Sequence, residues 1–191
     1  AKILAIKGTV TPSTLEDVNL VAEVEFIKDG KIVQETVFGE SKIPRNKGKI
    51  LSLSIEPSNV SANPEAIKAI LAADLITLGP GSLYTSILPN LKVYGIAQAL
   101  SASRAKKVYI CNVTTQPGET DQYTCYDHVS VIQNTLPNVH IDAVICNNFH
   151  EYNIPDFVSW VKINQKILDE FHVFQGNLVD DQFPWRHDSD K

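Results

Sequence analysis

The first third of the chain alternates hydrophobic and polar residues with a period of two. Residues 18–26 read Val-Asn-Leu-Val-Ala-Glu-Val-Glu-Phe, a pattern that predicts a half-buried strand. Asp29-Gly30 follows shortly afterwards and is typical of a tight hairpin turn between two strands. The segments 32–38 and 49–55 continue as further strands. The sequence therefore predicts a small β-rich segment over residues 1–57.

After Pro57 the pattern changes to short apolar strands that alternate with helices. Asn63-Pro64-Glu65 is typical of a helix start, and Thr124-x-x-Asp127 resembles a capping box at the start of a second helix. Strands that alternate with helices indicate parallel βαβ units. Strands are predicted at 75–78, 108–111 and 141–146, and further helices at 95–103 and 156–171. We therefore predict an α/β fold over residues 58–191, with a Rossmann-like, mostly parallel sheet flanked by helices and the β-rich segment as a small insertion.

Each of the three predicted parallel strands ends in a polar loop. The loops cover residues 79–86, 112–121 and 147–152. Because the carboxyl ends of parallel strands meet at one edge of a sheet, we expect the loops to lie at the same edge. Ligands of open α/β sheets bind at that edge.

The first loop, Gly79-Pro80-Gly81-Ser82-Leu83-Tyr84-Thr85-Ser86, has features that suit a phosphate group. Glycines allow the backbone to approach an anion closely, hydroxyl groups donate hydrogen bonds, and a following helix would add the positive end of its dipole. The loop matches neither the P-loop motif nor the dinucleotide-binding glycine motif. A plain tight turn therefore remains the alternative.

Carboxylates in the second loop and a basic residue near the C-terminus are further candidates. Glu119 and Asp121 are spaced so that both could face one Mg²⁺ ion or sugar hydroxyls, and ordinary turn chemistry is the alternative. Arg186 lies among several aspartates near the C-terminus. It either forms local ion pairs on the surface or reaches over the cleft to a phosphate as a bidentate hydrogen-bond donor.

Composition narrows the classes of partner. Hydrophobic residues make up 43% of the chain and the net charge is −5, which suits a globular protein and offers no basic face for nucleic acid. No uncharged run could form a membrane-spanning helix, and residues 1–7 contain no signal-peptide apolar block. Three cysteines without a Cys-x-x-Cys pair favour a reducing, cytoplasmic location.

Two long motifs resemble a known family. They are Asp-Leu-Ile-Thr-Leu-Gly-Pro-Gly-Ser-Leu-Tyr-Thr-Ser-Ile-Leu-Pro-Asn-Leu at 74–91 and Lys-Val-Tyr-Ile-Cys-Asn-Val-Thr-Thr-Gln-Pro-Gly-Glu-Thr-Asp at 107–121. Both resemble the signatures of the gluconeogenesis factor (YvcK-like) family, which is related to 2-phospho-L-lactate transferases (CofD-like). Members of the family open with a Gly-Gly-Gly-Thr-Gly loop that is absent here. The chain is therefore expected to resemble the later part of a family member, and the absence of methionine, even at position 1, agrees with this expectation.

The resemblance implies a regulatory protein that binds a nucleotide sugar of the UDP-N-acetylglucosamine type. Such a protein would support growth on gluconeogenic carbon sources and cell shape through protein partners in cell-wall metabolism. The alternative is a CofD-like transferase that moves 2-phospho-L-lactate from a nucleotide diphosphate donor to a deazaflavin acceptor with Mg²⁺, held by Glu119 and Asp121. Catalytic residues and oligomeric state stay open. Carried over by position, the implied ligand-binding residues are Gly79, Gly81, Ser82, Tyr84, Thr85, Ser86, Asn112, Gln116, Glu119, Asp121 and Arg186.

Overall fold

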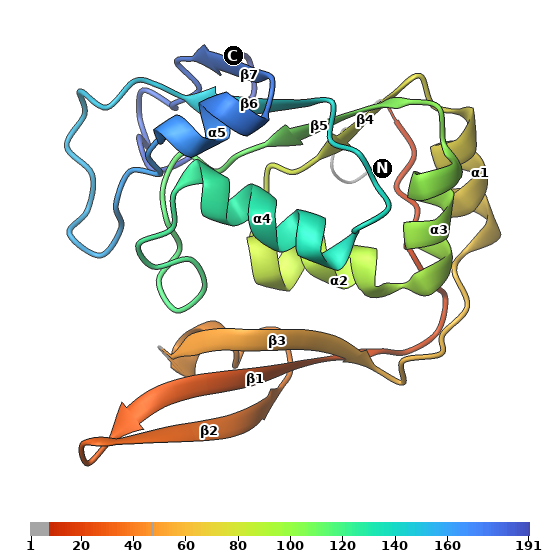
Figure 1. Cartoon of the computed structure of the whole chain (residues 1–191), viewed down its shortest axis with the longest axis horizontal. Coiled ribbons are helices and arrows are strands. Elements are labelled where there is room, and N and C mark those ends of the chain that lie inside the picture. The colour runs from red at the N-terminus through yellow and green to blue at the C-terminus, as the bar shows by residue number, and fades with distance from the viewer. Residues whose placement is uncertain (1–7, 47) are drawn as a thin grey trace.

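The protein is arranged in three layers (Figure 1). A computed structural model describes residues 8–46 and 48–191, so that the segment 1–7, where no signal peptide was predicted, and Lys47 lie outside the described residues. A parallel sheet forms one layer, helices form the next, and a small antiparallel sheet packs beneath the helices. This arrangement confirms the predicted α/β class with an added β-rich segment.

The small sheet is built by the N-terminal part of the chain. Its strands are β1 (Asn19–Lys28), β2 (Lys31–Phe38) and β3 (Lys49–Glu56), paired antiparallel in the order β2-β1-β3. The predicted turn joins β1 and β2, and Asp29 and Gly30 both adopt positive φ angles there. One face of β1 is buried, as the alternating pattern predicted, so this face binds the sheet to the rest of the molecule.

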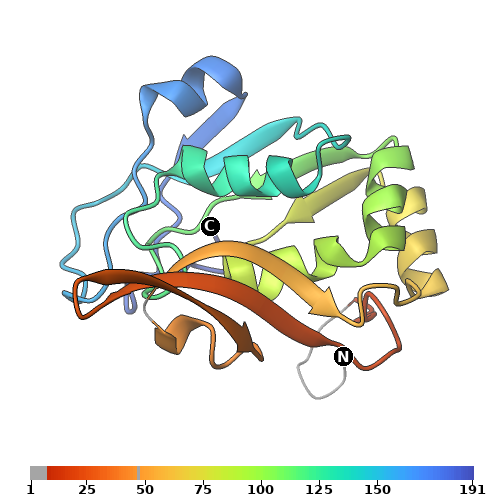
Figure 2. The same cartoon turned by 60° about the horizontal axis from the view of Figure 1, so that its bottom comes forward.

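The larger sheet contains four parallel strands in the order β4-β5-β6-β7. Helices connect successive strands, and α2 and α4 lie between the two sheets (Figures 1 and 2). No described helix has the length and hydropathy needed to cross a membrane. In chain order the elements are α1 (Pro64–Ala72), β4 (Leu75–Leu78), the π-helical turn η2 (Leu83–Ile87), α2 (Leu88–Lys92), α3 (Tyr94–Ala102), β5 (Lys106–Ile110), α4 (Cys125–Thr135), β6 (Ala143–Asn147), α5 (Gln165–Glu170) and β7 (Val173–Gly176).

Side-chain caps fix the starts of three helices. The side chain of Asn63 accepts a hydrogen bond from the Glu65 N–H at the start of α1. At the start of α4, Thr124 and Asp127 form the reciprocal capping box that the sequence predicted. At the start of α5, the side chain of Asn164 accepts a hydrogen bond from the Ile167 N–H.

The predicted helix over 156–171 is wrong for its first nine residues, because only Gln165–Glu170 is helical. The preceding segment instead pairs with the loop after β5. Trp160 forms a β-bridge with Thr114, and the Val161 N–H donates to the Val113 carbonyl. The spacing of apolar residues resembled a helix face, but Phe157 is 68% exposed. Pairing with a segment distant in sequence therefore outweighed the local pattern, and the strand β7 after α5 was not predicted.

The loop after β5 also lies in close contact with the connection between β2 and β3. Gly118 has a φ angle of 77°, and a Cβ atom there would overlap the backbone carbonyl of Pro44. Pro44 begins a short 3-10 turn, η1 (Pro44–Asn46), between β2 and β3. A glycine is required at this point for its backbone conformation and for the lack of space.

We expect Gly118→Ala to destabilise the fold more than Gly30→Ala. Gly30 has a similar φ of 74°, but an added Cβ would meet no other atom within 4 Å, so its substitution costs only the conformational penalty. That penalty is about 1–2 kcal/mol. Gly118→Ala must also displace Pro44, which adds roughly 1–3 kcal/mol. Urea unfolding of both variants measures the difference. Equal midpoints would show that the Gly118–Pro44 contact is unimportant.

Candidate functional site

A pocket of about 370 Å³ opens at the carboxyl ends of β4 and β5. We call it the carboxyl-edge pocket. It brings together five of the residues predicted from the sequence, and adds Pro80, Val113, Thr114, Trp185 and His187. The five predicted residues in its lining are Gly81, Ser82, Asn112, Gln116 and Arg186.

The side-chain amide of Asn112 links the first two loops. Its Oδ1 accepts from the Gly81 N–H at 3.3 Å, and its Nδ2 donates to the Gly81 carbonyl at 3.0 Å. The same Nδ2 lies 3.3 Å from Oε1 of Gln116, whose Nε2 donates to Ser82 Oγ at 2.8 Å. Since Ser82 Oγ accepts this bond, its own O–H remains available to donate into the pocket.

Gly79 does not line the pocket, but its backbone conformation positions the first loop. Its φ angle is 81°, and a Cβ atom would lie 2.9 Å from the Ile110 carbonyl at the end of β5. The glycine thus lets the first loop pass directly over the neighbouring strand.

The carboxylate of Glu119 occupies the amino end of the π-helical turn η2, which lies largely within the first loop. Its Oε2 accepts from the Tyr84 N–H at 3.2 Å, and its Oε1 accepts from the Thr85 hydroxyl at 2.9 Å. Burial raises the pKa of Glu119, although these two hydrogen bonds act in the opposite direction. The helix end that was predicted to receive a phosphate is therefore already neutralised by a side chain of the same protein.

Asp121 and Ser86 have separate local contacts. Asp121 Oδ2 accepts from the Gly118 N–H at 2.7 Å within its own loop, which matches the turn-chemistry alternative. The Ser86 carbonyl accepts from Asn90 Nδ2, and its side chain does not line the pocket. Within residues 8–46 and 48–191, no three His, Cys, Asp or Glu side chains are grouped to hold a metal ion.

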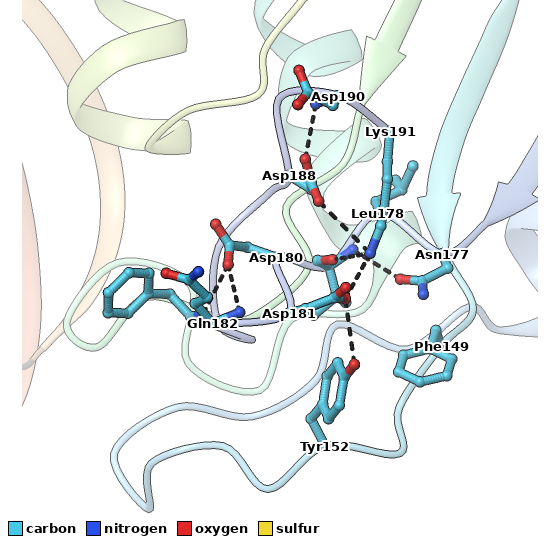
Figure 3. A network of polar contacts seen from close by, with 12 residues as sticks. Phe149, Tyr152, Asn177, Leu178, Asp180, Asp181, Gln182, Asp188, Asp190 and Lys191 are labelled. Atoms are coloured by element: carbon cyan, nitrogen blue, oxygen red, sulfur yellow. Dashed lines mark hydrogen bonds and ion pairs between the residues drawn. The ribbon is translucent and has the colours of Figure 1, made fainter.

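The C-terminal segment 177–191 brings Arg186 to the pocket. Val179 is fully buried and pairs with His187 in a β-bridge, while Thr114 Oγ1 donates to the Trp185 carbonyl at 3.1 Å. Further along, Nζ of Lys191 bonds the Asp181 carboxylate at 2.8 Å, as Figure 3 shows. The Thr114–Trp185 hydrogen bond holds the segment against the loop after β5, and the other two contacts lie within the segment.

The acids near Arg186 are engaged by other groups. Asp181 and Asp188 face Lys191, and Asp180 accepts from the backbone N–H groups of Gln182 and Phe183 (Figure 3). Among the described residues, Arg186 has no carboxylate within 4.0 Å, and its guanidinium carbon lies 5.6 Å from the centre of the Phe183 ring. Within residues 8–46 and 48–191, Arg186 therefore forms no ion pair.

His187 is part of the pocket lining. Its Nε2 is buried and has no hydrogen-bond partner among the described residues, and the backbone of Cys111 lies close to the imidazole. Burial lowers the pKa of His187, so the imidazole is mainly neutral at pH 7. The fixed positive charge of the lining comes from Arg186.

The third predicted loop lies at the same edge but outside the carboxyl-edge pocket. Asn147 is buried, its Nδ2 donates to the Phe149 carbonyl, and its Oδ1 accepts from the Leu178 N–H at 3.2 Å. This loop thus anchors the C-terminal segment rather than lining the pocket. The pairing of Trp185 with Thr114, 71 positions apart, had no local signal in the sequence.

We expect Glu119→Ala to destabilise the protein by about 1–3 kcal/mol, because the Tyr84 N–H and the Thr85 hydroxyl lose their acceptor. Glu119→Gln retains an oxygen acceptor and should lose less. Asp121→Asn serves as the control, since Asp121 is exposed and the amide oxygen of the introduced side chain can still accept from the Gly118 N–H. Chemical unfolding followed by circular dichroism measures all three. A wild-type midpoint for Glu119→Ala would contradict the capping role.

Comparison with known proteins identifies the family. A family model described as 2-phospho-L-lactate transferase CofD matches residues 1–168. The gluconeogenesis factor of Listeria innocua is 41% identical over 197 aligned residues, which cover 100% of this chain and 59% of that protein. That of Bacillus subtilis is 44% identical over 159 residues, covering 83% of this chain and 47% of that protein.

Solved structures agree with this assignment. A member of the UPF0052 family from Bacillus halodurans has a TM-score of 0.78 and 35% identity, and the match covers 95% of this chain and 59% of that one. The chain spans 59% of the Listeria innocua relative's length. The chain belongs to the 2-phospho-L-lactate transferase CofD family, and relatives that it matches are named gluconeogenesis factors.

Proposed function

We propose that the carboxyl-edge pocket binds the diphosphate of a nucleotide sugar of the UDP-N-acetylglucosamine type. The observation that carries this proposal is the position of Arg186, a cation without a carboxylate partner among the described residues, in a lining that contains no acidic side chain. An arginine left free in a polar pocket suits a phosphate group, because its planar fork donates two parallel hydrogen bonds.

Neutral groups around the arginine support the same ligand class. The Ser82 hydroxyl has a free proton, and the Asn112 and Gln116 amides are fixed by their mutual contacts and by those to the first loop. Rigid polar groups of this kind orient an anion without reorganising when it binds. Because Glu119 already occupies the nearby helix end, Arg186 supplies the main charge for the phosphates.

In the cell, we propose that ligand binding regulates growth on gluconeogenic carbon sources and cell shape through protein partners in cell-wall metabolism. The names of the curated relatives support the link to gluconeogenesis. The partners and the connection to cell shape come from the family resemblance of the two loop motifs.

The second candidate function is transfer of 2-phospho-L-lactate from a nucleotide diphosphate donor to a deazaflavin acceptor. The match of the CofD family model to residues 1–168 favours it. Both functions use a nucleotide diphosphate in the same pocket. They differ in turnover, so incubation with the donor and the deazaflavin followed by chromatography of the products separates them.

We expect Arg186→Ala to weaken binding of UDP-N-acetylglucosamine by roughly one to two decades. A charge-assisted contact to phosphate contributes about 1.5–3 kcal/mol, which corresponds to that loss. Arg186→Lys should recover only part of the affinity, because an ammonium group retains the charge without the planar fork. Isothermal titration calorimetry at fixed salt measures the affinities.

The matched control is Arg104→Ala, which removes an exposed arginine just before the amino end of β5, at the opposite edge of the sheet. Its affinity should equal that of the wild type. Equal affinities for wild type, Arg186→Ala and Arg186→Lys would refute the assignment of Arg186 to the phosphates.

A further inference from the structure

An aromatic side chain stands beside the proposed phosphate contact. Trp185 precedes Arg186, is half-buried, and lines the carboxyl-edge pocket together with Ser82 and Gln116. The pocket therefore combines one flat apolar surface with a cation and neutral donors. A ligand with a planar ring next to an anionic group has the matching chemistry.

Three sets of hydrogen bonds hold the backbone around Trp185 in place. Its carbonyl accepts from Thr114 Oγ1 at 3.1 Å, and the Arg186 N–H closes a turn onto the Phe183 carbonyl at 2.8 Å. The start of this turn is fixed because Asp180 accepts from two successive backbone N–H groups. The position of the tryptophan is thus set before a ligand arrives.

The other aromatic ring of the turn has a different environment. Phe183 is 45% exposed, does not line the pocket, and has the Arg186 guanidinium 5.6 Å from its centre. It meets Trp185 nearly at a right angle, with ring centroids 5.6 Å apart and an interplanar angle of 77°. An edge-to-face contact of this kind fixes the orientation of an aromatic ring. Phe183 thus supports the tryptophan from outside the pocket.

We propose that Trp185 stacks on the base of the nucleotide and thereby selects nucleoside diphosphates over other diphosphates. This inference rests on the proposed function, since it assigns the base of the same ligand whose phosphates Arg186 contacts. Base–aromatic stacking contributes to affinity for every base, because each base has a π-face. Trp185 therefore determines the class of the ligand, a nucleotide, rather than the identity of its base.

Three variants separate stacking from phosphate binding. Trp185→Ala should weaken UDP-N-acetylglucosamine and UDP by tenfold or more and leave the affinity for inorganic pyrophosphate unchanged. Trp185→Phe should retain most of the nucleotide affinity, since it preserves an aromatic face. Arg186→Ala, in contrast, should weaken all three ligands. A stronger effect of Trp185→Ala on N-acetylglucosamine 1-phosphate than on UDP would assign the ring to the sugar and overturn the proposal.

Fluorescence gives an independent readout. The chain has two tryptophans, Trp160 and Trp185, so Trp160→Phe leaves Trp185 as the only tryptophan, whose emission can be excited selectively over that of the tyrosines. We expect UDP to quench this emission in a saturable manner and pyrophosphate to leave it unchanged. If UDP-N-acetylglucosamine binds to wild type and Trp185→Ala with equal affinity, the stacking proposal is wrong while the proposed function stands. If neither the nucleotides nor pyrophosphate bind the wild type, the proposed function itself fails.

Discussion

The hydrogen bonds between the Asn112 amide and the Gly81 peptide determine the geometry of the carboxyl edge. A primary amide can accept from a backbone N–H and donate to the carbonyl of the same residue, and Asn112 does both. These bonds join the loops that follow β4 and β5. Ser82 and Gln116 then meet across the junction, and the floor of the pocket follows from this arrangement.

Charge is divided between two places at this edge. Glu119 places a carboxylate at the amino end of the π-helical turn η2. Arg186 brings a positive charge to the pocket from the C-terminal segment. The order of these contacts in the sequence is unrelated to their position in space. The parallel sheet explains the result, because all its strands deliver their following loops to one edge.

The sequence predicted those features that depend on neighbouring residues. The hairpin at Asp29-Gly30 and the capping box at Thr124 involve short separations and were recognised from local patterns. The convergence of the first two loops was predictable from the parallel strands. The role of Glu119 as a cap was missed because its partners, Tyr84 and Thr85, lie 35 and 34 positions away.

Long-range pairing likewise accounts for the wrong helix before α5. Phe157, Trp160 and Val161 follow the i, i+3, i+4 spacing of a helix face. Trp160 and Val161 nevertheless pair with the strand-like loop at Val113 and Thr114. The same loop holds Trp185 through Thr114. Residues of this kind enter the site through contacts that no window of sequence contains, and only the folded chain reveals them.

Mapping of the ligand by NMR tests the central claim most directly. In a titration of the ¹⁵N-labelled protein with UDP-N-acetylglucosamine, we expect shifts concentrated in residues 81–82, 112–116 and 185–187, including the side-chain N–H of Arg186. A second groove at the amino edge, lined by parts of α3 and by residues 135–139, provides an internal comparison. Shifts confined to that groove, with Arg186 unaffected, would contradict the account.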